Sequence, residues 1–215
     1  MTLKAAHAGL GLALAIATPA AAQVPAACAD AHPDAAAFVA ALEAEGLTLL
    51  PSGEAMPEEV VDRLSWILAA EYLLTDTGGQ PLADILASQR MAAGNIARLA
   101  PLPEATTRVL IDDGADLTGR GRVVIASWRV TSLKDVEQQC RLTAPEWFED
   151  ATALRIGERL AATDNAFAGE GLTASAETPD GTLSILAFNF YRQVVGAFAP
   201  EAVIDQTLRF PEDAP

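Results

Sequence analysis

Residues 107–143 have the sequence TRVLIDDGADLTGRGRVVIASWRVTSLKDVEQQCRLT, and this stretch decides the fold. Its β-branched and apolar residues form runs separated by turn-forming residues, which predicts strands over residues 107–112, 122–131 and 136–143. The middle run is apolar at the consecutive positions 123–126, which is typical of a strand covered on both faces. Residues 113–119 are rich in aspartate and glycine and predict a hairpin loop. We therefore expect an antiparallel meander at the centre of a sheet.

The third predicted strand carries one of the two cysteines of the chain. Val136, Cys140 and Leu142 alternate with polar residues, so they share the apolar face of this strand. The other cysteine is Cys28. In an exported protein two cysteines are usually paired, and the wide spacing differs from the Cys-x-x-Cys motif of redox-active pairs. We therefore expect a structural Cys28–Cys140 disulfide that holds the start of the chain against the middle of the sheet.

The residues before the meander have helical patterns. Apolar positions and starting prolines predict helices over residues 33–45, 57–75 and 81–99, with a short strand over residues 47–50. The second helix has an apolar coat on most of its surface, which predicts burial on several sides. A Gly-Gly-Gln-Pro turn separates the last two helices, so they should form an antiparallel hairpin.

The residues after the meander predict a helix, a hairpin and a second helix. Capping-box spacing from Thr143 indicates a helix that begins at Pro145. Residues 172–177 and 182–191 should form a β-hairpin around the turn Thr-Pro-Asp-Gly, and Pro200 should begin a short helix that ends near residue 209. Helices and strands are segregated along the chain, which predicts the α+β class. The expected architecture is an antiparallel β-sheet, made of the meander and the C-terminal hairpin, covered by the N-terminal helical hairpin and additional helices.

The N-terminus resembles a secretory signal peptide over residues 1–22. Lys4 supplies the positive charge, residues 10–17 are apolar, and Ala20, Ala21 and Ala22 match the small residues of a cleavage site. A lipoprotein is the alternative, because Cys28 follows two alanines. After removal of a signal peptide, residues 23–210 would be one domain with a loose tail over residues 211–215. The expected localisation is periplasmic or secreted. Abundant arginine and alanine with only two lysines are typical of a G+C-rich bacterial genome.

The chain is strongly acidic, with a formal net charge of −15. Such a charge repels phosphate backbones and anionic lipid, so nucleic acid is not an expected partner. No stretch after the signal segment is long and apolar enough to span a bilayer, so we expect a soluble mature protein.

The usual catalytic motifs and metal-binding patterns are missing from the sequence. His32 is the single histidine after residue 22, and no Gly-x-Ser-x-Gly elbow accompanies it. Cysteine and histidine are too few for a zinc site of the common kinds, and the motif around residues 114–121 lacks the lysine of a phosphate-binding loop. We therefore expect no cofactor and no metal.

Two polar residues occupy apolar sectors of the helical hairpin. Glu71 falls on the sector of Val60 and Leu64, and Gln89 falls within the apolar face of the next helix. A carboxylate in apolar surroundings has a raised pKa and is a candidate acid or base. The alternative is that Gln89 simply satisfies Glu71. Asn189 lies on an otherwise apolar strand, and the same two alternatives apply to it: a residue of a functional site, or a polar residue satisfied within the core.

The basic residues concentrate in the predicted sheet. They are Arg108, Arg120, Arg122, Arg129, Lys134 and Arg141. They could form an anion-binding face, or they could be cross-strand partners of acidic residues.

These features favour an exported protein of the bacterial envelope that is a non-enzymatic binding or accessory module. Its partner would be a small molecule or another envelope protein. A small periplasmic hydrolase that uses Glu71 as acid or base is one alternative. A subunit whose sheet edge pairs with a partner protein is another.

Overall fold

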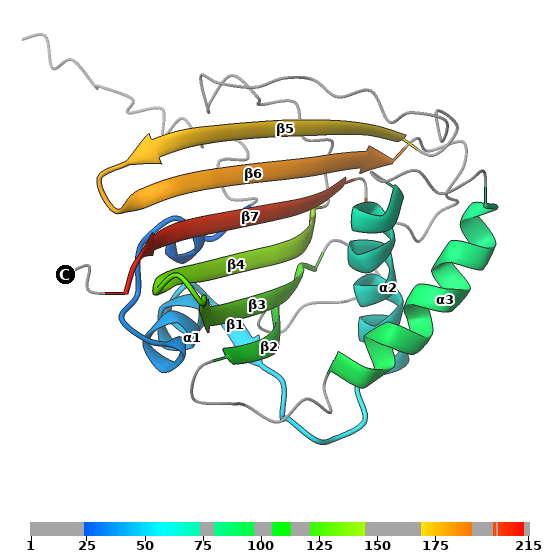
Figure 1. The fold of residues 1–215 in the computed structure, drawn as a ribbon. Coiled ribbons are helices and arrows are strands. Elements are labelled where there is room, and N and C mark those ends of the chain that lie inside the picture. The colour runs from blue at the N-terminus through cyan, green and yellow to red at the C-terminus, as the bar shows by residue number, and fades with distance from the viewer. Residues whose placement is uncertain are drawn as a thin grey trace, which may run out of the picture.

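The computed structural model describes residues 24–73, 80–96, 105–112, 121–144, 169–190, 200 and 202–212. The described helices are a short 3₁₀ helix η1 (Ala26–Cys28), α1 (Ala35–Ala44), α2 (Glu58–Leu73) and α3 (Leu82–Ile96). The described strands are β1 (Leu47–Leu49), β2 (Ala105–Asp112), β3 (Val123–Val130), β4 (Asp135–Ala144), β5 (Gly169–Thr178), β6 (Gly181–Phe190) and β7 (Ala202–Pro211). The strands form one sheet in the order β1-β2-β3-β4-β7-β6-β5, and all neighbours are antiparallel (Figure 1). The predicted α+β class, with a meander and a C-terminal hairpin in an antiparallel sheet, is confirmed.

The helix expected from Pro200 to residue 209 is wrong, because this segment is the strand β7. β7 lies between β4 and β6 and joins the meander to the hairpin. Ile204, Gln206 and Leu208 are buried and alternate with less buried residues, which is the period of a strand. Pro200 and the acidic residue after it resemble a helix start, but β-branched residues follow, and pairing on both sides outweighs this weak local signal.

The ends of several elements also differ from the prediction. β5 begins at Gly169, three residues before the strand expected over residues 172–177. The tail expected from residue 211 is partly held, because Pro211 pairs with Asp135 and the Glu212 N–H donates to the Lys134 carbonyl oxygen at 2.9 Å. The tight turn between β5 and β6 is as predicted, with Gly181 at a φ of +155°.

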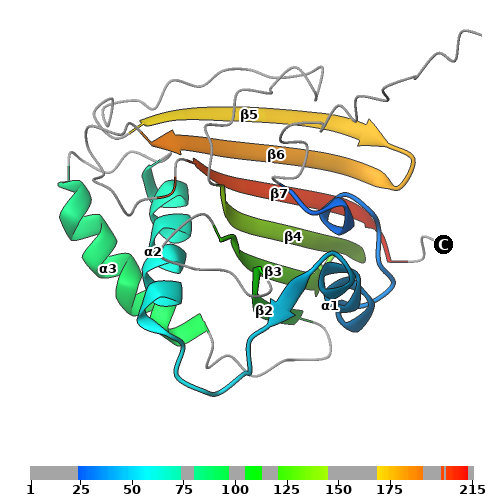
Figure 2. The ribbon, with the colours of Figure 1, turned by 180° about the vertical axis from the view of Figure 1, so that it is seen from behind.

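The two faces of the sheet pack against different helices, and β3 is buried on both. On one face, α1 packs against a core that includes Val124, Cys140 and Ile204 (Figure 2). On the other face, α2 and α3 lie side by side at one end of the sheet and pack against residues that include Val123 and Ile125 (Figure 1). The consecutive apolar residues of β3 therefore serve two cores, as the sequence predicted.

The expected disulfide between Cys28 and Cys140 is present, and it joins residues 112 positions apart. Both cysteines are buried, with Cys28 1% and Cys140 0% exposed. The Gln138 side-chain amide donates to the carbonyl oxygens of Ala27 at 3.1 Å and Asp30 at 2.8 Å. The N-terminal segment is thus held against the sheet by a covalent bond and by hydrogen bonds.

The helix α1 begins two residues later than predicted. Asp34 is its N-cap and accepts from the Ala37 N–H at 2.8 Å, so Pro33 lies outside the helix.

Several predictions fall outside the described residues. They concern the signal segment, the loop over residues 113–119 and the helix from residue 145. Among the helices that the structure describes, none has the length and apolar character needed to cross a membrane.

Candidate functional site

Glu71 does not have the apolar surroundings that made it a candidate acid or base. Its side chain is 63% exposed, and its Oε2 accepts from Arg141 Nη1 at 3.0 Å. The helices α2 and α3 do form a hairpin, joined by an ion pair between Asp62 and Arg90. Gln89 is partly buried on α3, and among the described contacts it makes no bond with Glu71. The expected burial of Glu71 is therefore wrong, and its role as an acid or base stays a prediction without that support.

The Glu71–Arg141 pair belongs to a polar cluster on the sheet. Asp205 lies across from Arg141 in the register of β4 and β7, and both its carboxylate oxygens accept from Gln139 Nε2 at 2.9 Å. Burial raises the pKa of the Asp205 carboxyl, and the nearby charge of Glu71 also raises it, while the Gln139 bond and the Arg141 charge oppose the rise. Burial outweighs the opposing contacts, so the pKa of Asp205 lies above its ordinary value even though Arg141 is nearby.

Most described arginines of the sheet pair with acidic residues. This agrees with the alternative that these arginines are partners of acidic residues, rather than with a common anion-binding face. Arg122 Nη2 lies 2.8 Å from Asp112 Oδ1. Glu137, whose side chain is 13% exposed, pairs with Arg129 and Arg209 from the strands on its two sides. Burial alone would raise the pKa of the Glu137 carboxyl, but the bonds from Arg209 and Arg129 outweigh burial and lower the pKa.

Arg108 differs from these arginines. It lies on β2 opposite Ala126, and its Nη1 donates to the Thr107 carbonyl oxygen at 3.4 Å. Within the described ranges, no ion pair joins Arg108 to a carboxylate. In an acidic protein, this cation therefore retains the capacity to bind an anion.

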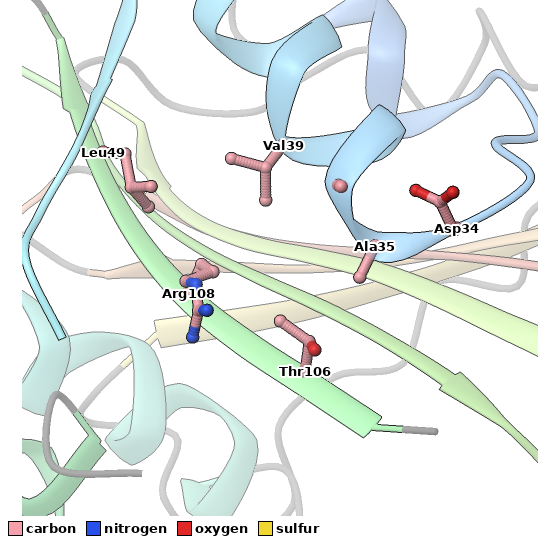
Figure 3. A pocket seen from close by; sticks show the side chains of 7 residues that line it. Asp34, Ala35, Val39, Leu49, Thr106 and Arg108 are labelled. Atoms are coloured by element: carbon pink, nitrogen blue, oxygen red, sulfur yellow. The ribbon is translucent and has the colours of Figure 1, made fainter. Parts of the chain in front are cut away.

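Arg108 borders a pocket of about 450 Å³ between α1 and β2. The pocket, which we name the Arg108 pocket, is lined by Asp34, Ala35, Ala36, Val39, Leu49, Thr106 and Arg108. Figure 3 shows Val39 and Ala35 projecting from α1, and Thr106 and Arg108 projecting from β2. The Asp34 side chain caps α1 by accepting from the Ala37 N–H through Oδ1, so the border of the pocket carries this acidic group as well as the guanidinium of Arg108. Apolar walls with one cation suit a ligand that has an apolar part and an anionic group.

The pocket was not predicted, because it depends on long-range packing between α1 and β2. The sequence identifies Arg108 as one of several basic residues and gives no reason to separate it from the others. The separating signal is the strand register, in which Arg129 faces Glu137 and Arg108 faces Ala126. A correct register would have been sufficient to single out Arg108, although not to find the pocket.

His32 and Asn189 both make contacts with other residues of the fold. His32 Nε2 lies 3.1 Å from the Ala27 carbonyl oxygen, and the ring stacks on Phe38 with centroids 5.5 Å apart. Asn189 is fully buried on β6 and takes part in an interaction within the fold. In the described part of the chain, no three histidine, cysteine, aspartate or glutamate side chains gather as metal ligands would.

The sequence matches no protein-family model, and neither the curated proteins nor the solved structures contain a match to it.

Proposed function

We propose that this protein is an exported, non-enzymatic binding module of the bacterial envelope, and that its ligand occupies the Arg108 pocket with an anionic group toward the guanidinium. The observation that carries the proposal is the arginine without a carboxylate partner among the described residues, at the border of an apolar pocket. A guanidinium forms strong, charge-assisted bonds with carboxylates and phosphates. The apolar walls from Val39 and Leu49 add the hydrophobic part of the affinity.

Two features support export. Residues 1–22 have the charge, the apolar run and the small residues of a signal peptide. The buried disulfide is a bond that persists in oxidising compartments outside the cytoplasm. The mature protein from the periplasmic fraction should therefore begin at Gln23 and have the mass of the disulfide form, and an intact-mass measurement of that fraction tests this.

The binding proposal is tested with octanoate, an apolar chain with one carboxylate, compared with octanol. Octanoate should raise the melting temperature by mass action, and octanol should raise it less. Replacement of Arg108 by glutamine should weaken octanoate binding about tenfold or more, because a bond between two charged groups is lost. Calorimetric titration measures this change.

The matched control is Arg209→Gln, which removes the same charge from an exposed arginine outside the pocket. It should leave the octanoate affinity unchanged. Equal weakening by both variants would show that the net charge, and not the pocket, determines binding. The proposal fails if octanoate does not bind or if Arg108→Gln binds it as well as the wild-type chain.

A further inference from the structure

The Arg108 pocket has an acidic group at one end. Trp128 lies opposite Thr106 in the register of β2 and β3, and its Nε1 donates to the His32 carbonyl oxygen at 3.3 Å. The start of α1, with Asp34 as its N-cap, therefore lies near Thr106. Figure 3 shows Asp34 and Thr106 toward the same end of the pocket.

The apolar walls lie toward the other end of the pocket. Val39 is on the second turn of α1, about 6 Å along the axis from the first residue of the helix. Leu49 lies opposite Leu110, which is two residues beyond Arg108 on β2. Along the strand, Arg108 thus lies between Thr106 and Leu49 (Figure 3). A ligand in this pocket meets an acidic group, then a basic group, then apolar side chains.

Both charged groups can contact a ligand. Asp34 is exposed and caps α1 through Oδ1, and a carboxylate can accept several hydrogen bonds, so its Oδ2 can accept from a ligand. The positive end of α1 offsets roughly half an elementary charge, which leaves about half of the negative charge of Asp34 to attract a cation. Arg108 donates to the Thr107 carbonyl oxygen at 3.4 Å, near the limit for a hydrogen bond, so the guanidinium can turn toward a ligand at little cost.

We propose that the ligand of this pocket is an apolar dipeptide, with its ammonium group at Asp34 and its carboxylate at Arg108. Its second side chain lies between Val39 and Leu49. This inference rests on the proposed binding function and names the ligand class. An extended dipeptide is about 7 Å long, and Thr106 and Arg108, two residues apart on β2, are separated by about the same distance. The alternative is that Asp34 serves only as the cap of α1.

The probe is alanyl-leucine. It is compared with N-acetyl-alanyl-leucine, which lacks the ammonium group, and with leucine, whose two charged groups are too close together to reach both residues. Alanyl-leucine should bind about two- to fivefold more tightly than either, which is the effect of one exposed ion pair. Calorimetric titration gives the three affinities. Binding of leucine or of the acetylated peptide that is as tight as that of alanyl-leucine would overturn the inference.

Asp34→Asn identifies the residue that contacts the ammonium group. Asparagine is as good an N-cap as aspartate, so this variant removes the charge and keeps α1. It should bind the free and the acetylated dipeptide equally, while octanoate binds at least as tightly as to the wild-type chain, which also reports that the pocket is intact. The matched control is Asp84→Asn, which removes the same charge from the first turn of α3, outside the pocket. A preference for the free dipeptide that persists in Asp34→Asn, or that disappears in Asp84→Asn, would overturn the inference.

The inference and the proposed function fail in different ways. Arg108→Gln should weaken octanoate and alanyl-leucine alike, because both place a carboxylate at this residue. Octanoate binding without dipeptide binding in the wild-type chain would overturn the inference and leave the proposed function standing. Binding of neither ligand would overturn both.

Discussion

Removal of the Cys28–Cys140 disulfide should cause a large loss of stability while leaving the helices and strands intact. The bond closes a loop of 112 residues, so the chain-entropy model assigns it about 5 kcal/mol of stabilisation through the unfolded state. Both cysteines are buried, so their replacement by alanine adds a small packing cost. We expect Cys28→Ala combined with Cys140→Ala to lower the free energy of unfolding by about 3–5 kcal/mol.

Urea denaturation of the oxidised wild-type protein and the double variant measures this difference. The wild-type protein with a reducing agent is the matched control, because it loses the bond without changing a residue. It should unfold at nearly the same urea concentration as the double variant. A difference below about 1 kcal/mol between oxidised and reduced protein would refute the reasoning. Such a small difference would mean that the unfolded chain is already compact without the bond, so that the bond removes little entropy from the unfolded ensemble.

The remaining predictions concern the sheet. Glu137→Gln should cost about 1 kcal/mol at pH 7, because it weakens the contacts with Arg129 and Arg209. Since the folded pKa of Glu137 lies below its ordinary value, this contribution is present above that value and lost as the pH falls through the folded pKa, which urea denaturation over a pH series measures. Asp205→Asn should show the opposite trend. Burial raises the folded pKa of Asp205, so the wild-type chain loses stability relative to this variant as the pH rises from about 4 toward 7, and a constant difference would contradict the assignment. Gly181→Ala should cost about 2–3 kcal/mol in thermal denaturation, because its φ is +155° and a Cβ would lie 2.2 Å from the Arg209 carbonyl oxygen. A cost below about 0.5 kcal/mol would show that the turn relaxes.

Local patterns were sufficient to predict most of the sheet. β3 has consecutive apolar residues because it serves two cores, and β4 alternates because its second face carries Glu137 and Gln139. These signals are properties of single strands and appear directly in the sequence. The disulfide followed from the number of cysteines and the expected compartment.

The remaining features depend on contacts between distant residues. The local pattern at Pro200 predicts a helix over the residues of β7, because it does not contain the pairing partners β4 and β6, which lie far away in the sequence. Helical periodicity predicts that Glu71 lies on an apolar face, but the periodicity does not reveal that Arg141 reaches it from β4. The Arg108 pocket requires α1 to lie against β2, which no local pattern encodes.

The place of β7 in the sheet has a consequence for how the chain matures. The last described strand in the sequence is the one that closes the gap between β4 and β6 (Figure 1). Until it is synthesised, the meander and the hairpin each retain an open hydrogen-bonding edge, and neither has its final neighbour. Incomplete chains would therefore expose two unpaired strand edges, which favours aggregation. We expect such chains to need chaperones. A protein built in this way gains from remaining unfolded during translation and closing its sheet only after the whole chain has emerged.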